Sequence, residues 1–441
     1  MRTLLSTKWP RLPQPSQRAF MGGLLFLFVA VSVQYSLKVM QPREDGMTRS
    51  AILRWSPQIQ ALEEGVDISR AFNYPNPPIM ALMLWPFTEL PPLAAALTWF
   101  YVKVAMALLA MFWTFRMLET PERPFPPWAK ALAVVLSLRP ILSDLSHGNV
   151  NILILFLVVG ALYAFHTRRD FLSGLVLALA IACKLTPALL ICYFVWKRSW
   201  SALAGTALGL WLFFFGVPGA ILGFEYNWQL LTGWVEVMVM PFIQGGFVTS
   251  EHHNQSLPGL VYRLLTHNPS FSDYIKDVYT PLAYSNFMNL STATAQWVVK
   301  VCMGLFAVLI MWTCRHPAKG VRRGWPLPAE YSLLLIGMLL FSERTWKHHA
   351  VTLLVPYAVL CYALAAGTLS RLGRRAVIAS LVISTLLIAS TSKGLLGSEA
   401  ADAAQVYGGF TFAFLVLAAG CAVVLRQARS CAARPSSLVS Q

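Results

Sequence analysis

A stretch of charged and aromatic side chains between two apolar runs is the part of this chain best suited to chemistry. Residues 341–356 read Phe-Ser-Glu-Arg-Thr-Trp-Lys-His-His-Ala-Val-Thr-Leu-Leu-Val-Pro. Arginine, lysine and histidine side chains can stabilise the negative charge of a departing phosphate. Polar clusters beside hydrocarbon are costly to hold, so they usually serve a function. The alternative interpretation is a solvated loop with basic anchors at the ends of two helices.

Other polar motifs interrupt the apolar runs earlier in the chain. Asp144, His147, Asn149 and Asn151 fall at one predicted helix junction, where an asparagine could also serve as a simple cap. Lys184-Leu-Thr-Pro breaks an apolar segment, because proline removes a backbone donor and interrupts a helix. Irregular backbone at membrane depth is tolerated where it lines a cavity.

Two further motifs lie in longer polar segments. Tyr74-Pro-Asn76-Pro-Pro is rigid because proline fixes its own φ and restricts the residue before it. The segment His252-His-Asn-Gln-Ser-Leu257 has an unusual density of polar side chains. Both also fit ordinary roles, as a helix-entry turn and a solvated loop.

The histidine pairs at 252–253 and 348–349 raise the question of a metal site. Adjacent histidines point to different sides of a helix, and no carboxylate spacing accompanies them. The sequence therefore predicts no metal site.

The composition places these motifs in a membrane protein. Of 441 residues, 56% are hydrophobic and 12% are charged, and the mean hydropathy is +0.57. That balance is too apolar for a soluble chain of this length.

The net charge of +16 would suggest nucleic acid in a soluble protein, but here the basic clusters fall in short connections between apolar runs. They match the positive-inside rule, so we expect no nucleic-acid partner. The seven cysteines have no spacing typical of a disulfide framework.

The basic clusters also predict the orientation. Both termini are expected in the cytoplasm, and the first apolar run, about 20–40, is expected to be a signal anchor. The segment after 170 is expected to form two short helices that meet at Lys184 on the outer side. Outer loops are predicted at about 41–92 and 223–294, with shorter outward connections around residues 143–149, 343–349 and 393–407. Membrane helices are predicted at about 93–116, 129–144, 150–166, 171–196 with its break, 201–222, 296–314, 327–342, 349–367, 375–392 and 408–425.

These segments predict an all-α polytopic membrane protein with about 10–12 transmembrane or half-crossing helices. Residues 1–425 are expected to form one membrane domain, and residues 426–441 a basic cytoplasmic tail. No internal repeat or low-complexity segment suggests a second domain.

Taken together, the motifs resemble a known order. Tyr-Pro-x-x-Pro, Gly-x-x-Asn, Lys-x-x-Pro, Asn-Gln-Ser-Leu and Ser-x-x-x-Trp-x-His-His followed by Leu-Leu-x-Pro occur here in the sequence of the family-87 glycosyltransferases. The resemblance runs from about Phe20 to Pro356. The tryptophan–histidine motif is its specific part.

The resemblance implies a GT-C-type helical bundle on the cytoplasmic membrane of a bacterium. It implies an inverting, metal-independent transfer of a hexose, often mannose in this family, from a polyprenyl-phosphate donor to a lipid or glycan acceptor on the outer face. No cofactor is implied, and membrane lipids are the surrounding partners. The oligomeric state does not follow from the resemblance.

The family's site residues can be placed on this chain. The expected donor-phosphate ligands are Lys184, Arg344, Lys347, His348 and His349. The expected substrate-binding residues are Tyr74, Asn76, Asp144, His147, Asn149, Asn151, Asn254, Gln255 and Trp346.

The expected catalytic base is Asp45, with Glu44 as the second choice and Asp67 or Asp144 after them. The family carries an aspartate early in its first outer loop, but its usual aspartate–aromatic spacing is absent here.

Two other functions therefore stay open. One is a transporter or flippase of lipid-linked sugars, although transporters usually place polar groups near the bilayer midplane in repeated halves. The other is an inactive homologue that binds sugar lipids.

Overall fold

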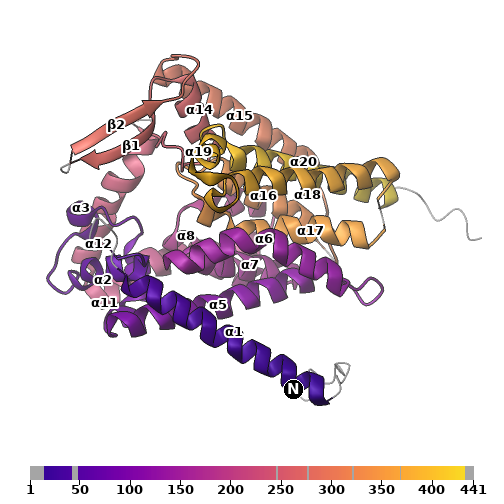
Figure 1. Cartoon of the computed structure of the whole chain (residues 1–441), viewed down its shortest axis with the longest axis horizontal. Helices are drawn as coiled ribbons and strands as arrows, with labels where there is room; N and C mark the ends of the chain where they lie inside the picture. Colours follow the sequence, from indigo (N-terminus) through magenta and orange to yellow (C-terminus); the bar gives the residue numbers. More distant parts are fainter. Residues whose placement is uncertain are drawn as a thin grey trace, which may run out of the picture.

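The protein is a bundle of helices with a small hairpin at one end (Figure 1). The computed structural model describes residues 14–41, 48–244, 247–275, 278–319, 322–367 and 369–432. This architecture confirms the predicted all-α polytopic membrane protein.

Within the described residues, six helical segments are long and apolar enough to cross a membrane. They are α5 (Pro92–Leu118), the continuous run of α10 (Trp200–Trp211), η2 (Leu212–Gly216) and α11 (Val217–Leu222), α15 (Thr292–Thr313), η4 (Lys347–Leu353) with α17 (Leu354–Ala365), α18 (Arg371–Ser390) and α20 (Gly409–Ala432).

Shorter helices complete the membrane part. Five of them are apolar but below spanning length: α4 (Pro78–Thr88), α7 (Asn151–His166), α8 (Asp170–Cys183), η1 (Thr186–Ala188) with α9 (Leu189–Trp196), and α16 (Pro326–Leu340). A further helix, α1 (Gln14–Met40), has 27 residues. The more polar α6 (Pro127–His147) runs beside α17. Each predicted membrane helix thus has a counterpart among these segments, and α4 is additional because it lies in the region predicted as the first outer loop.

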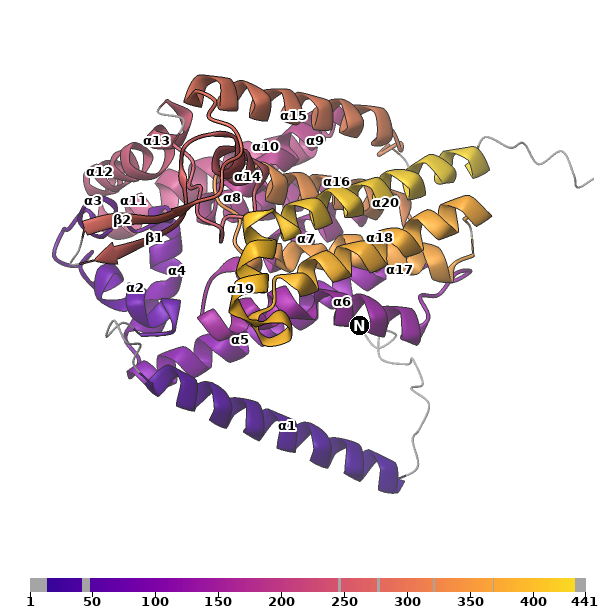
Figure 2. The ribbon, with the colours of Figure 1, turned by 45° about the horizontal axis from the view of Figure 1, so that its top comes forward.

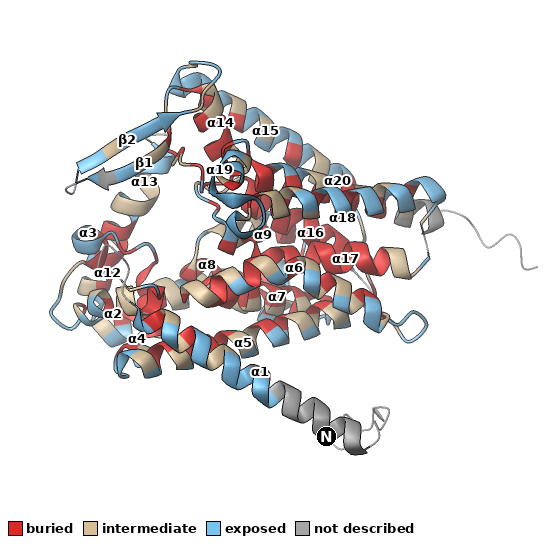
Figure 3. Ribbon diagram, viewed as in Figure 1, coloured by how far each residue is buried: buried red, intermediate tan, exposed pale blue. Residues whose placement is uncertain are grey.

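The core of the bundle is formed by α7, α16 and α17 (Figure 3). These helices are apolar on all sides, which is typical of helices surrounded by other helices. In contrast, only 17% of the residues in the apolar stretch of α15 are buried. Both α1 and α15 lie at the edge of the bundle in both views (Figure 1, Figure 2).

Long-range hydrogen bonds define two opposite ends of the bundle. At one end, Arg322 binds Asp170 at 2.9 Å and Lys197 binds the His316 carbonyl at 2.7 Å. At the other end, the side chain of Asn149 lies 3.2 Å from that of His348. The first end gathers the connections that carry basic clusters. The segment from α8 to α9 starts and finishes there, so it is a hairpin with its turn at Lys184, as predicted.

The end that carries the candidate site residues is more structured than the expectation of plain loops. The region predicted as the first outer loop contains α4 as well as α2 (Ala51–Gln60) and α3 (Ile68–Phe72). The second contains α12 (Phe224–Trp234), η3 (Val235–Val239), α13 (Met240–Ile243), α14 (Leu257–Leu265) and an antiparallel pair of strands, β1 (Pro269–Ile275) and β2 (Val278–Tyr284). The predicted connection at 393–407 is a helix, α19 (Lys393–Val406), kinked at Gly397.

Gly148 is the residue that lets α6 end beside α2. It has a φ of 64°, a left-handed conformation that favours glycine at a helix C-terminus. A Cβ atom there would lie 2.3 Å from Ser50 Oγ. Its carbonyl accepts a hydrogen bond from the Trp99 indole at 3.0 Å. The Gly-x-x-Asn motif therefore has a local structural reason as well as a possible functional one.

Candidate functional site

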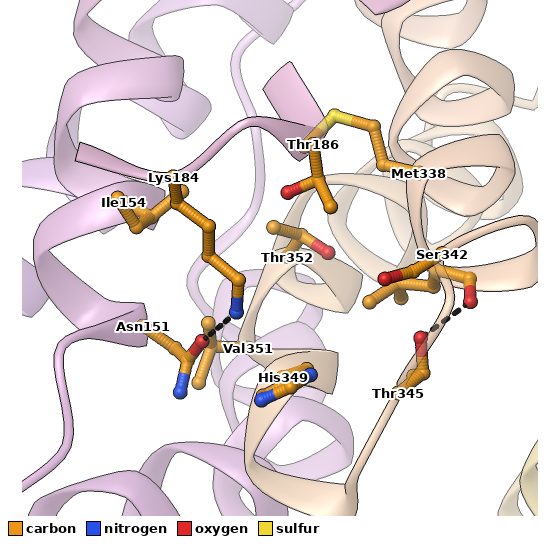
Figure 4. A pocket seen from close by; sticks show the side chains of 11 residues that line it. Asn151, Ile154, Lys184, Thr186, Met338, Ser342, Thr345, His349, Val351 and Thr352 are labelled. Atoms are coloured by element: carbon orange, nitrogen blue, oxygen red, sulfur yellow. Dashed lines mark hydrogen bonds between the residues drawn. The ribbon is translucent and has the colours of Figure 1, made fainter. Parts of the chain in front are cut away.

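A small pocket opens where the α8–α9 hairpin turns (Figure 4). Four separate parts of the chain line it: α7, the turn after α8, the end of α16, and η4 with the loop before it. The lining residues are Asn151, Ile154, Lys184, Thr186, Met338, Leu339, Ser342, Thr345, His349, Val351 and Thr352. The pocket is therefore polar on the side of the hairpin turn and η4, and apolar toward the bundle.

Lys184 reaches the pocket at the end of a chain of buried polar contacts. Lys103 pairs with Asp144 at 3.2 Å, and both side chains are fully buried. The other carboxylate oxygen of Asp144 accepts hydrogen bonds from the side-chain and backbone nitrogens of Asn151, at 2.9 and 3.2 Å. The Asn151 carbonyl oxygen then accepts from Lys184 Nζ at 2.7 Å. Lys184 is thus held by one hydrogen bond, which leaves two ammonium hydrogens without a partner among the described residues.

The two adjacent histidines lie in different surroundings. His349 lines the pocket, and its Nδ1 lies 3.3 Å from the Trp346 backbone nitrogen, which donates to it. His348 is buried beside the pocket and contacts Asn149 through Nε2. The Asn149 oxygen accepts from the Val150 nitrogen, so its amide nitrogen donates to His348. This contact makes Nε2 of His348 an acceptor, so in the neutral ring the proton sits on Nδ1.

One lining hydroxyl also lacks a partner. Thr352 is 4% exposed, and its hydroxyl has no hydrogen bond to any described residue. A buried polar group without a partner is costly, so such groups are usually satisfied by water or by a ligand. The unused donors of Lys184 and Thr352 face the same space (Figure 4).

The Asn-Gln-Ser-Leu motif supports the histidine motif. Asn254 accepts from the Thr345 nitrogen at 2.9 Å and donates to the Glu343 carbonyl at 2.9 Å. Gln255 donates from its backbone to the Thr345 carbonyl at 2.7 Å. Both side chains are buried and bonded to backbone groups. Asn254 and Gln255, expected to bind substrate, therefore fix the loop that precedes η4.

Arg263 and His252 lie in the same segment as Asn254 and Gln255, which holds the loop before η4. The buried Arg263 guanidinium donates to backbone carbonyls on both sides of it, including those of Ser250, at 3.0 Å, and Val406, at 2.8 Å. Burial lowers the pKa of His252 to about 4, so that ring is neutral at neutral pH. These contacts join the segment 250–263 to α19. Arg263 was not among the expected site residues, although a single arginine on the amphipathic segment 257–265 was a visible signal.

The five expected phosphate ligands separate into three groups. Lys184 and His349 line the pocket, and His348 lies next to it. Arg344 is exposed and donates to the Thr249 hydroxyl at 2.7 Å, outside the lining. Lys347 is also outside the lining and lies near His147 and Lys38.

The remaining expected substrate residues are also spread out. His147 stacks on His348 with ring centroids 5.4 Å apart. Trp346 is partly exposed and packs edge-on against His348. Tyr74 and Asn76 are both buried, Tyr74 edge-on against Trp55, and neither lines the pocket.

Carboxylates give no described candidate for a base in the pocket. Asp45 and Glu44 lie outside the described residues. Asp67 caps α3 and binds Arg70 at 3.0 Å, and it does not line the pocket. Asp144 is fully buried and engaged by Lys103 and Asn151. Its place in the hydrogen-bond chain is that of a support for Asn151.

Lys103 is the supporting residue that the motif analysis missed. It interrupts the apolar run 93–116, and a charge inside a membrane helix usually marks a polar partner.

Within the described residues, no three histidine, cysteine, aspartate or glutamate side chains gather in a way that could hold a metal ion.

The fold and the pocket together define a class of protein. It is a multi-pass membrane protein with a polar pocket that presents a lysine, a histidine and a hydroxyl near one end of the bundle. Such an arrangement suits the charged head of an amphiphilic ligand, because the apolar remainder can stay in the membrane.

The chain belongs to glycosyltransferase family 87. The sequence profile of that family matches residues 74–342, more than half of the chain, and this confirms the resemblance seen in the motifs.

Characterised relatives come from mycobacteria. One is the polyprenol-phosphate-mannose-dependent alpha-(1-2)-phosphatidylinositol pentamannoside mannosyltransferase of Mycobacterium tuberculosis (strain CDC 1551 / Oshkosh), 28% identical over 291 residues, which are 65% of this chain and 57% of that protein. Another is the polyprenol-phosphate-mannose-dependent alpha-(1-2)-phosphatidylinositol mannoside mannosyltransferase of Mycolicibacterium smegmatis, 27% identical over 68% of this chain and 63% of that protein. The chain thus spans about three fifths of the length of these relatives. No solved structure matches this chain.

Proposed function

We propose that this protein transfers mannose from a polyprenyl-phosphate donor to a phosphatidylinositol mannoside-type lipid acceptor. The relatives from mycobacteria carry out this class of reaction according to their names, and family membership supports a glycosyltransferase. The observation that carries the proposal is Lys184. It holds unused donors in a pocket shared with His349 and Thr352.

The proposed chemistry is a single displacement with inversion at the anomeric carbon. The acceptor hydroxyl oxygen forms a bond to that carbon while the bond to the phosphate oxygen breaks. The electron pair leaves with polyprenyl phosphate, whose growing charge is stabilised by Lys184 and His349. The hydroxyl proton passes to a general base, for which Asp45 and then Glu44 remain our candidates. The proposed transfer needs no metal ion or cofactor.

The proposed orientation follows the basic connections. We propose that the end with Arg322 and Lys197 faces the cytoplasm of a bacterial cell, together with both termini. The pocket then opens on the outer side of the cytoplasmic membrane. Its apolar lining, including Met338 and Leu339, supports lateral entry of a lipid donor.

The test is a transfer assay with the purified full chain in detergent or nanodiscs. Polyprenyl-phosphate [¹⁴C]mannose and phosphatidylinositol mannoside are supplied with excess EDTA. We expect label in a larger glycolipid at an undiminished rate. Donor binding without transfer would indicate an inactive homologue. Movement of the donor across a proteoliposome membrane without transfer would indicate a transporter.

A further inference from the structure

A group of basic side chains lies near His147, outside the pocket. It consists of Lys38 near the end of α1, Arg49 just before α2, and Lys347 at the start of η4, and we call it the outer basic cluster. His147 stacks on His348, the residue after Lys347, and Gly148 lies against Ser50, the residue after Arg49, so Arg49 and Lys347 lie near the same pair of histidines. The charges of Arg49 and Lys347 also act on Lys38. None of them lines the pocket.

Within the described part of the chain, the outer basic cluster differs from the other cations at this end in making no ion pair, although the Asp402 carboxylate, which Lys393 binds, also acts on Lys347. Arg70 pairs with Asp67 and Glu236, Arg344 with Glu343, and Lys393 with Asp402. Among the described residues, Lys38, Arg49 and Lys347 make no hydrogen bond and no ion pair. Gathering like charges is unfavourable unless an anion joins them, and lysine and arginine are common phosphate ligands.

His348 separates the cluster from the pocket. It is 3% exposed, and it interacts electrostatically with both Lys184 and Lys347. His147 stacks on its far face, with Nδ1 2.6 Å from the Ser143 carbonyl. Nδ1 therefore donates to that carbonyl, which leaves Nε2 of His147 as the nitrogen available beside the cluster. The buried His348 thus interacts with unused cationic donors both in the pocket and in the outer basic cluster.

A transferase that moves a sugar from one phosphate-bearing lipid to another has two lipid phosphates to bind, which calls for two anion sites. Lys184 and the pocket provide one of them, and the outer basic cluster provides the other. We propose that Lys38, Arg49 and Lys347, bordered by His147, bind the phosphodiester of the lipid acceptor. The inference rests on the proposed function and adds to it, because it says how the acceptor is oriented. The sugar part of its headgroup would run from the cluster past His348 toward the donor in the pocket.

The kinetic test uses Lys38→Gln, Lys347→Gln and the double variant of the full chain. Removing one charged hydrogen bond should raise the KM for phosphatidylinositol mannoside about tenfold in each single variant. The KM for the polyprenyl-phosphate donor should not change. A mannosylated diacylglycerol, which has no phosphate, should be used equally well by wild type and variants. Lys300→Gln, on the exposed face of α15, is the matched control and should behave as wild type.

Equal losses with the phosphate-free acceptor would overturn the inference, since they would show a general defect. A rise in the donor KM alone would also overturn it and would assign the cluster to the donor.

A binding measurement separates this inference from the proposed function. Native mass spectrometry of the purified chain should show preferential binding of phosphatidylinositol over diacylglycerol in wild type, and loss of that preference in the double variant. Inorganic phosphate at millimolar concentration should compete weakly; full displacement would overturn the assignment to a lipid headgroup in favour of free phosphate. If wild type keeps this preference but transfers no mannose, the site stands and the proposed function fails. Equal binding of the two lipids by wild type would refute the site itself.

Discussion

Two lysines on the same helical hairpin face opposite ends of the bundle and differ in how fully they are bonded. Lys197, after α9, donates to Glu330 at 2.7 Å and to the carbonyls of His316 and Cys314 at 2.7 and 3.1 Å. Lys184, at the turn, donates only to Asn151 within the part of the chain that the structure describes. An ammonium group has three hydrogens, so Lys197 uses all of them and Lys184 uses one.

The difference separates a structural role from a binding role. Around Lys197, the buried Glu330 carboxylate also accepts from the Tyr193 hydroxyl and the His316 nitrogen, so the network is closed. Around Lys184, the hydrogen-bond chain ends at a pocket. A closed buried network holds segments together, whereas an open one is expensive unless a ligand completes it. Burial of a charge within a membrane protein is therefore not by itself a sign of a binding site.

The largest effect should come from exchanging each lysine for methionine. Lys184→Met should lower the transfer rate by about a hundredfold or more, because it removes a preorganised charge at the leaving phosphate. The folded protein should be recovered in normal yield. Activity per folded molecule and melting temperature in detergent are the two measurements.

Lys197→Met should show the opposite pattern. It leaves Glu330 buried without its charged partner, which costs roughly 3–5 kcal/mol of stability. The melting temperature should fall, while the rate per folded molecule stays near that of wild type. If both variants lose activity without loss of stability, the contrast between the two lysines is wrong.

A smaller effect should follow from cutting the chain that orients Lys184. Asn151→Leu removes the acceptor of the Lys184 hydrogen bond but leaves the lysine in place. The rate should fall about tenfold, as expected for a misplaced but intact catalytic group. Asn149→Leu is the companion variant, because Asn149 contacts His348 instead. Restoration of activity in Asn151→Gln but not in Asn151→Leu would identify orientation as the cause, and a normal rate in Asn151→Leu would contradict the role.

The smallest effect is expected at Arg344. Its guanidinium is exposed and bound to Thr249 outside the pocket. Exposed charge pairs contribute about 0–1 kcal/mol, so Arg344→Gln should change the rate by at most a few fold. Comparing the donor KM of this variant with that of Lys184→Met would show whether Arg344 contributes to donor binding. A hundredfold loss would place Arg344 in the donor site after all, as the motif alone suggested.

The sequence was sufficient for the membrane architecture because hydropathy and basic connections act over whole segments. It predicted the break at Lys184, and the motifs found three residues that meet in the pocket: Asn151, Lys184 and His349. It did not predict α3 or the helices α12, α13 and α14 within the two outer regions. Segments such as α3 and α14 are short, and their stability comes from tertiary contacts such as those of Arg263.

The sequence also could not divide the motif residues by role. Arg344, Lys347, His348 and His349 are neighbours along the chain, yet they point to the Thr249 loop, the outer basic cluster, Asn149 and the pocket, respectively. The direction in which each of these side chains points depends on the 3₁₀ geometry of η4. It also depends on Asn254, which holds the loop before η4 by accepting from the Thr345 nitrogen. Neither property is visible in the spacing of residue types.

The short length of α8 has a consequence for how deep a lipid must enter. Its 14 residues rise about 21 Å at 1.5 Å each, whereas the hydrocarbon layer is about 30 Å thick. If α8 starts at one edge of the hydrocarbon layer, Lys184 at its end lies about 9 Å inside the opposite edge. A headgroup that reaches it has to sink below the plane of its neighbours, or the bilayer has to thin beside the hairpin. During synthesis, α8 and α9 are each too short to be inserted alone, so the translocon has to receive them as a pair, with the lysine carried in at their tip.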